Sequence, residues 1–175
     1  MNERSAFLLL PLAALAVSPA CYAVQYLSVD QAQALMFPDA VLTPSPLTLT
    51  AEQKKTIEAR TGTKVRQSEL RLWRAPGGYF LVDQVLGKHE FITYAVALDA
   101  AGAVRQIEIL DYRETHGDEV RRPGWRSQFA GKTSADTLRV SKDIQNISGA
   151  TLSCVHITDG IRRLLATYDV AIRPR

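Results

Sequence analysis

The sequence predicts an α+β fold, in which an antiparallel meander sheet is backed by helices within a single domain that follows a signal peptide. Apolar residues recur at helical spacing near both ends of the chain. Between residues 68 and 112 they follow a period of two instead, which is the spacing of strands. The turns between these alternating segments are too short to hold crossover helices, and short connections favour antiparallel pairing.

Two helices are predicted before the sheet. Pro38 stops the first, and Thr50 begins the second as the N-cap of a capping box with Gln53. A connector that contains two prolines separates them and is expected to be extended. The predicted segments are a helix over Val29–Phe37, the connector over Val41–Thr50, and a helix over Ala51–Arg60 that ends by Gly62.

Four strands are predicted next, separated by turn signals that are rich in glycine. The third strand is apolar on both of its faces, which indicates a central place in the sheet. The four segments are Ser68–Arg74, Tyr79–Leu86, Glu90–Asp99 and Val104–Tyr112.

The C-terminal third begins with a polar segment, Arg113–Asp136, which is predicted to be a long functional loop with one helical turn. A short edge strand over Leu138–Ile144 and an amphipathic helix over Leu152–Thr167 are expected to follow. Asp159 and Arg163 lie one turn apart on that helix and are expected to pair. Its apolar stripe consists of Cys154, Ile157, Ile161, Leu164, Leu165 and Tyr168.

The N-terminus resembles an export signal. The apolar stretch Ala6–Val17 is too short to span a bilayer comfortably, and small residues follow it, so we expect cleavage after Ala23. Lipid modification at Cys21 is the alternative. The predicted domains are a signal peptide (1–23), N-terminal helices with a connector (24–65) and the main domain (66–175). After cleavage only Cys154 remains, which excludes an intramolecular disulfide.

The charge pattern argues against a nucleic-acid partner. The net charge is +3 and the isoelectric point is near 9.0, but the basic residues are scattered and no aromatic residues interleave with a basic stripe. The sequence also lacks a nucleophile elbow, a dinucleotide fingerprint and a phosphate-binding P-loop.

The turn Ser148-Gly149-Ala150-Thr151 stands directly before the last predicted helix. The first N–H groups of a helix have no acceptor within the helix, and the helix dipole favours negative charge at that end. A small turn at this place is therefore suited to hold a phosphate.

The run Ile147–Ser153 resembles the flavin-attachment sequence of the FMN-binding domain family. The resemblance implies that Thr151 carries FMN through a phosphoester bond, with Ser148, Gly149, Ala150, Leu152 and Ser153 around it. In the family a flavin transferase makes this bond from FAD and releases AMP. One departure is Gln145, which stands where the family usually has an aspartate; Asp143 is the nearest upstream acid.

A second stretch supports the same resemblance. Glu114-Thr115-His116-Gly117, with the downstream run from Trp125 to Gly131, is similar to a loop of the flavin carriers in the Rnf and sodium-pumping quinone reductase complexes. The resemblance implies that residues 114–117 line the flavin. His116 replaces the usual proline and either contacts the flavin ring or remains a solvent-exposed histidine.

The implied function is that of a periplasmic carrier of covalent FMN, which passes electrons between a membrane-associated donor and an exported acceptor. Such a protein is an electron-transfer flavoprotein rather than an independent enzyme. A non-redox periplasmic binding module and a flavin reductase with non-covalent FMN are the alternatives.

Two further groups of residues are expected to be structural. Cys154 and His156 point to different faces of a helix, so they do not form a joint metal site, and Cys154 is expected in the core. Trp73 and Trp125 could stack on a flavin, but aromatic residues more often fill cores.

Overall fold

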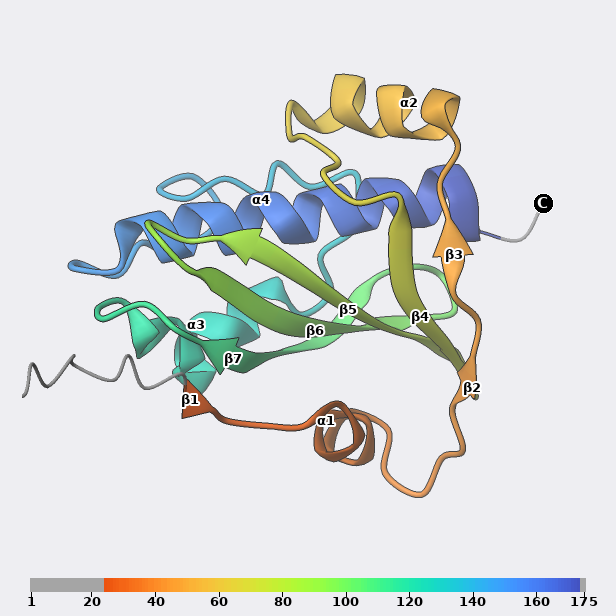
Figure 1. Cartoon of the computed structure of the whole chain (residues 1–175), viewed down its shortest axis with the longest axis horizontal. Helices are drawn as coiled ribbons and strands as arrows, with labels where there is room; N and C mark the ends of the chain where they lie inside the picture. Colours follow the sequence, from red (N-terminus) through yellow and green to blue (C-terminus); the bar gives the residue numbers. More distant parts are fainter. Residues whose placement is uncertain (1–23, 174–175) are drawn as a thin grey trace, which may run out of the picture.

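A computed structural model describes residues 24–173, and the predicted signal peptide over residues 1–23 lies outside this range. The centre of the fold is an open antiparallel sheet with the strand order β1-β7-β6-β5-β4-β2, in which β3 also pairs with β4 (Figure 1). Helices back the sheet, so the predicted α+β class is confirmed. The strands are β1 (Val24–Gln25), β2 (Thr43–Pro44), β3 (Leu47–Thr48), β4 (Glu69–Ala75), β5 (Gly78–Leu86), β6 (Phe91–Asp99) and β7 (Val104–Tyr112).

The helices differ greatly in length. Within residues 24–173, three helices have two or more turns. The others are short: three lie in the connection between β7 and α4, and one follows α4. The helices are α1 (Val29–Met36), α2 (Ala51–Thr61), η1 (Asp118–Arg121), α3 (Pro123–Arg126), η2 (Ser127–Phe129), α4 (Thr151–Thr167) and the π-helical turn η3 (Tyr168–Ile172).

The two helices predicted before the sheet are confirmed, with bounds that agree to within one residue, and their caps explain where they begin and end. Thr50 Oγ1 accepts the N–H of Gln53 at 3.2 Å, and the Gln53 side chain accepts the Thr50 N–H at 2.9 Å. Gly62 ends α2 with a φ of +69°, a value that favours glycine. The connector before α2 is extended as predicted, and its two short strands pair with β4.

The four-strand meander is also confirmed. β6 lies between β5 and β7 and pairs antiparallel with both. Its successive residues Tyr94 and Ala95, which point to opposite faces of the sheet, are both fully buried. The central position predicted for this strand from its apolar faces is therefore correct.

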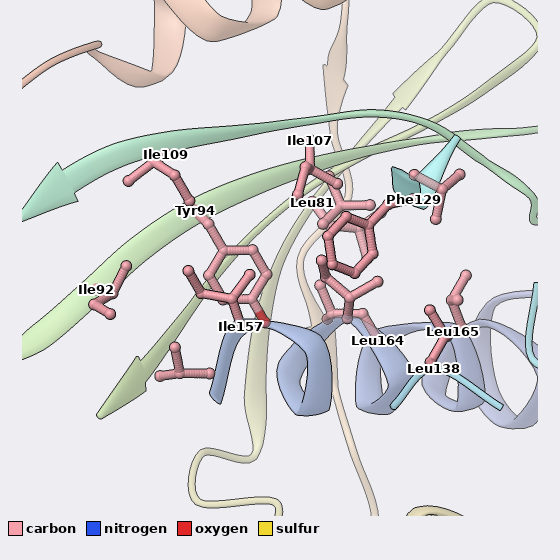
Figure 2. Close-up of a cluster of buried hydrophobic side chains, with 14 of the residues drawn as sticks. Leu81, Ile92, Tyr94, Ile107, Ile109, Phe129, Leu138, Ile157, Leu164 and Leu165 are labelled. Carbon is pink, nitrogen blue, oxygen red and sulfur yellow. The ribbon is translucent and has the colours of Figure 1, made fainter. Parts of the chain in front are cut away.

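The elements form layers around the sheet (Figure 1). α4 covers one face, α1 covers the opposite face, and α2 lies on the outer side of α4. The main core lies between the sheet and α4, where strand residues such as Ile107 and Ile109 face Ile157 and Leu164 of the helix (Figure 2). All six residues of the predicted apolar stripe of α4 are buried.

The predicted pair of Asp159 and Arg163 does not form. Arg163 instead contacts Asp83 of β5, with 2.6 Å between Nη2 and Oδ2, and Asp159 pairs with Arg162 at 2.8 Å. The reason is that Arg163 faces the sheet, where the Asp83 carboxylate, only 15% exposed, offers a better partner than an acid on the same helix.

The segment between β7 and α4 contains more helix than predicted. Residues 118–129 form η1, α3 and η2, where a single turn was expected. Trp125 and Phe129 are buried there and pack edge to face, with 5.1 Å between their ring centroids. Much of this segment therefore closes one end of the core.

The edge strand predicted over Leu138–Ile144 is wrong. The segment is a tight turn, with one isolated bridge between Val140 and Ile144 and positive φ angles at Leu138 and Ser141. The Asp143 carboxylate accepts the N–H groups of Leu138 at 2.9 Å and Arg139 at 2.8 Å. A side chain that bonds the local backbone in this way competes with strand pairing.

Across residues 24–173, no helix is long and apolar enough to cross a membrane.

Gly160 is expected to be the position in α4 that tolerates substitution least. A Cβ there would overlap the Tyr94 hydroxyl and lie 2.7 Å from Val85 Cγ1. Overpacking outweighs the gain in helix propensity, so Gly160→Ala should lower the free energy of unfolding by about 1–2 kcal/mol. Urea denaturation measures this loss.

Gly124→Ala is the matched control, because a Cβ at that helical glycine meets no described atom within 4 Å. Its free energy of unfolding should stay within about 0.5 kcal/mol of wild type. Equal stability of the two variants would contradict the close approach of α4 to β6.

Candidate functional site

The site begins at the N-terminus of α4. Gly149 has a φ of +88°, a left-handed conformation that turns the chain into the helix at little cost only for glycine. Ala150 is the N-cap residue, and within the described chain no side chain caps the helix. The N–H groups of Thr151, Leu152 and Ser153 have no acceptors within the helix. This end of α4 can therefore receive an anion.

An open pocket of about 460 Å³ lies at this helix start. Three segments line it: the turn between β5 and β6, the segment after β7, and the first turn of α4 with the residues before it. The structure thus brings together two segments that the sequence singled out separately. The lining residues are Lys88, His89, Glu114, Thr115, His116, Gly149, Ala150, Thr151, Leu152 and Ser153.

Two of the predicted site residues do not line this pocket. Ser148 is exposed on the preceding turn. Gly117 is buried behind the pocket wall, where a Cβ would lie 2.6 Å from the Tyr112 hydroxyl and 2.8 Å from Ser153 Oγ. Gly117 also has a φ of +99°, so both its conformation and the space around it call for glycine.

Glu114 connects two of the lining segments. Its Oε1 accepts the backbone N–H groups of His89 at 2.5 Å and Glu90 at 2.9 Å. Partial burial raises the pKa of Glu114, but hydrogen bonds from the backbone at residues 88–90 outweigh it, and the pKa falls below its usual value of 4.5. Gly87 makes room for this contact, since a Cβ there would lie 2.5 Å from the carboxylate. The Glu114 side chain therefore holds the β5–β6 turn.

Tyr112 holds the third segment in place. Its hydroxyl donates to the His116 carbonyl at 2.5 Å and lies 2.9 Å from Ser153 Oγ on α4. Burial raises the pKa of Tyr112 to about 12, so the phenol keeps its proton at neutral pH. The end of β7 and the first turn of α4 are thus joined directly behind the pocket.

The remaining lining groups could contact both a phosphate and an aromatic ring of a ligand. Lys88 brings a positive charge, and His89 and His116 are exposed imidazoles that can donate hydrogen bonds. Leu152 is 48% exposed, which gives the pocket an apolar surface beside Thr151. The sequence analysis did not single out Lys88 and His89 as site residues; the only signal was the predicted turn that begins at Gly87.

Thr151 itself is exposed at the pocket, and its Oγ1 accepts a hydrogen bond from Asn146 Nδ2 at 2.9 Å. The neighbouring Gln145 is held by its backbone, because its N–H donates to Gln128 Oε1 and its carbonyl accepts from Trp125 Nε1. Asp143, the nearest upstream acid, uses its carboxylate in the turn at residues 138–143.

The other candidates from the sequence lie outside this pocket. Trp125 and Cys154 are buried in the main core. Trp73 is half-buried on the opposite face of the sheet, where it packs against Phe80. His156 lies on α4 outside the pocket lining. Among residues 24–173, no cluster of three or more His, Cys, Asp and Glu side chains could hold a metal ion.

Residues 87–166 match the family model described as the FMN-binding domain. The matched range begins at the β5–β6 turn and ends within α4, so it contains every residue that lines the pocket. No curated protein matches the chain.

Glu114→Gln is expected to loosen the β5–β6 turn. A neutral amide accepts hydrogen bonds less strongly than a carboxylate, so the free energy of unfolding at pH 7 should fall by about 1 kcal/mol. Because the folded pKa of Glu114 is lowered, the stabilisation is complete above the unfolded pKa and is lost as the pH falls through the folded pKa. The difference between the two proteins should therefore shrink in acid.

Denaturation of both proteins between pH 7 and pH 3 measures this effect. Glu90→Gln is the control, since the exposed Glu90 carboxylate makes no hydrogen bond or ion pair within residues 24–173. A difference between wild type and Glu114→Gln that did not change with pH would count against the role of the carboxylate.

Proposed function

We propose that this chain, whose residues 87–166 belong to the FMN-binding domain family, carries FMN through a phosphoester bond to Thr151. The family match supports a flavin-binding protein. The observation that carries the finer proposal is the placement of Thr151. It is an exposed threonine in the first turn of α4, a helix that no side chain of residues 24–173 caps, and it lines a pocket that Lys88 also lines.

The residues of the pocket fit a phosphodiester at this position. The first-turn N–H groups of α4 point along the helix axis toward the anion, and the helix dipole adds to the attraction. Lys88, on the facing turn, supplies a compensating charge. Glu114 lines the pocket too, but its carboxylate is occupied by backbone N–H groups, which reduces its repulsion of an anion.

The rest of the pocket would hold the ring system. Leu152 offers apolar contact, and Thr115 and His116 offer polar atoms on the facing wall. The bound flavin supplies the redox chemistry, while the chain positions it and sets its electrostatic surroundings. His116 lines the pocket and would be able to donate a hydrogen bond to a bound ring, through which the protein would influence the electronic properties of the ring.

Attachment of the flavin requires a second protein. By the family resemblance, a flavin transferase moves the FMN part of FAD onto the threonine and releases AMP. The acceptor must then be accessible, and Thr151 and Gly149 are both exposed. Gln145, in place of the usual aspartate, leaves transfer without an acid at that position.

We further place the mature protein in the periplasm, exported by the signal peptide over residues 1–23 and cleaved after Ala23. There it would relay electrons from a membrane-associated donor to an exported acceptor. The support is the N-terminal sequence together with the resemblance to carriers of membrane redox complexes.

Attachment at Thr151 can be tested by intact mass. The protein, expressed with its leader and a flavin transferase, should have the mass of residues 24–175 plus FMN less one water. It should stay yellow through denaturing gel filtration. Thr151→Val should lack the added mass, because a methyl group cannot form the phosphoester.

Thr48→Val is the matched control, since it makes the same chemical change at an exposed threonine of β3 that does not line the pocket, and it should keep the flavin mass. A colourless wild type, or flavin mass that persists in Thr151→Val, would refute attachment at Thr151. Colour that is lost on denaturation would indicate non-covalent FMN.

The carrier role predicts that the loaded protein does not turn over by itself. With NADH as the only added reductant, oxidation should not exceed that of an equal amount of free FMN, measured at 340 nm. Steady NADH oxidation by the isolated protein would favour a flavin reductase instead.

A further inference from the structure

We propose that Asn146 is a positioning residue that orients the Thr151 hydroxyl for flavin attachment, an inference that rests on the proposed function. The Asn146 side chain donates from Nδ2 to Thr151 Oγ1 at 2.9 Å. Within residues 24–173 this is the one side-chain hydrogen bond of the Thr151 hydroxyl. Nothing in the sequence pattern had singled out Asn146.

This contact restricts the hydroxyl in a useful way. A threonine side chain in a helix divides between two χ1 rotamers, and its hydroxyl tends to bond nearby backbone carbonyls. A donor from Asn146 fixes Oγ1 as an acceptor and so selects one rotamer. The second lone pair of Oγ1 and the hydroxyl proton remain free for reaction.

Asn146 is itself held by contacts on both sides. Gln145 donates its N–H to Gln128 Oε1 at 2.7 Å and accepts from Trp125 Nε1 at 2.8 Å. On the other side, the Ala150 N–H donates to the Ile147 carbonyl at 3.0 Å. The backbone before Asn146 is thus anchored, through the Gln145 carbonyl, to Trp125, which is buried in the core.

The neighbouring candidates cannot take this role. The Gln145 side chain is exposed and makes no hydrogen bond with the described part of the chain, because the bonds of this residue are those of its backbone. The Asp143 carboxylate is taken by the backbone of its own turn. The group that touches the acceptor oxygen is therefore the neutral amide of residue 146.

The transfer itself is a displacement at phosphorus. Thr151 Oγ1 forms the bond to the phosphorus of the FMN part of FAD, the bond from that phosphorus to the bridging oxygen breaks, and AMP leaves with the electron pair. The hydroxyl proton passes to a base of the transferase. Asn146 takes no proton in this step; it holds Oγ1 so that a lone pair faces the incoming phosphorus.

The test compares Asn146→Ala with Gln145→Ala, which removes the adjacent amide but keeps both backbone hydrogen bonds. Flavin attachment by a flavin transferase with FAD is followed by intact mass over a range of carrier concentrations. For Asn146→Ala, kcat should fall about fivefold to tenfold while KM for the carrier stays within about twofold of wild type. Gln145→Ala should match wild type in both.

A second readout needs no flavin. Three-bond couplings to Thr151 Cγ2, measured by NMR on the flavin-free protein, should report a single χ1 rotamer in wild type and in Gln145→Ala. In Asn146→Ala they should report averaging between rotamers. Purely structural damage would lower kcat in both variants alike, and it would not change the Thr151 couplings in Asn146→Ala alone.

The outcomes separate the two proposals. Averaged couplings in wild type, an unchanged kcat in Asn146→Ala, or equal losses in both variants would overturn the role of Asn146. A wild-type chain that the transferase never modifies would refute the proposed function, and with it any role in attachment, while the couplings still decide whether the hydrogen bond forms.

Discussion

The ion pair between Asp83 on β5 and Arg163 on α4 is the contact that fixes the helix on the sheet. Arg163 lies 2.6 Å from Asp83 Oδ2, and the Tyr94 hydroxyl donates to the same oxygen at 2.9 Å. Burial and the charge of Asp83 raise the pKa of Tyr94 well above its usual value, so it remains a donor. The two side chains are only 12% and 15% exposed, and breaking a fully buried pair typically costs about 3–5 kcal/mol. Because Gly160 leaves room for Tyr94, α4 meets the sheet in one register.

That register places the functional end of the helix. An α-helix rises about 1.5 Å per residue, so Thr151 stands roughly 13 Å along the axis from Gly160. At that distance the helix start lies beside the β5–β6 turn and the end of β7. Tyr112 then joins the segment after β7 to α4 through the His116 carbonyl and Ser153 Oγ, and Glu114 joins that segment to the β5–β6 turn through backbone N–H groups. These contacts do not use the exposed side chains of Lys88, His89 and Leu152, which can therefore meet a ligand.

Regular elements could be predicted from the sequence, and side-chain contacts between distant segments could not. Periodicity and the box at Thr50 located α2 and the four strands, because those signals are local. The segment Leu138–Ile144 misled, because its apolar residues alternate while Asp143 bonds the backbone into a turn. Arg163 was assigned the wrong partner, because an acid on the same helix is visible in sequence, whereas Asp83, eighty residues away, is not.

The candidate site, too, could be predicted from the sequence only in part. A resemblance within two short segments pointed to residues 114–117 and 148–153, and most of these residues line one pocket. Lys88 and His89 have no such signal; they join the pocket only because β5 ends and β6 begins next to the start of α4. Asn146 is likewise significant only once the chain turns back toward Thr151. Composition and spacing cannot reveal contacts of this kind.

The three long helices differ at their N-termini in a way that bears on ligand binding. Ser28 and Thr50 cap α1 and α2 with complete capping boxes, whereas α4 begins at Ala150 with no side-chain cap in the described chain. An alanine at this position typically costs about 1 kcal/mol relative to a capping residue. The first-turn N–H groups of α4 are therefore left for another acceptor. A phosphate bound there would satisfy them and would stabilise the folded state by linkage, so of these three helix starts the one that lacks a side-chain cap in the described chain is the one that lies at the candidate pocket.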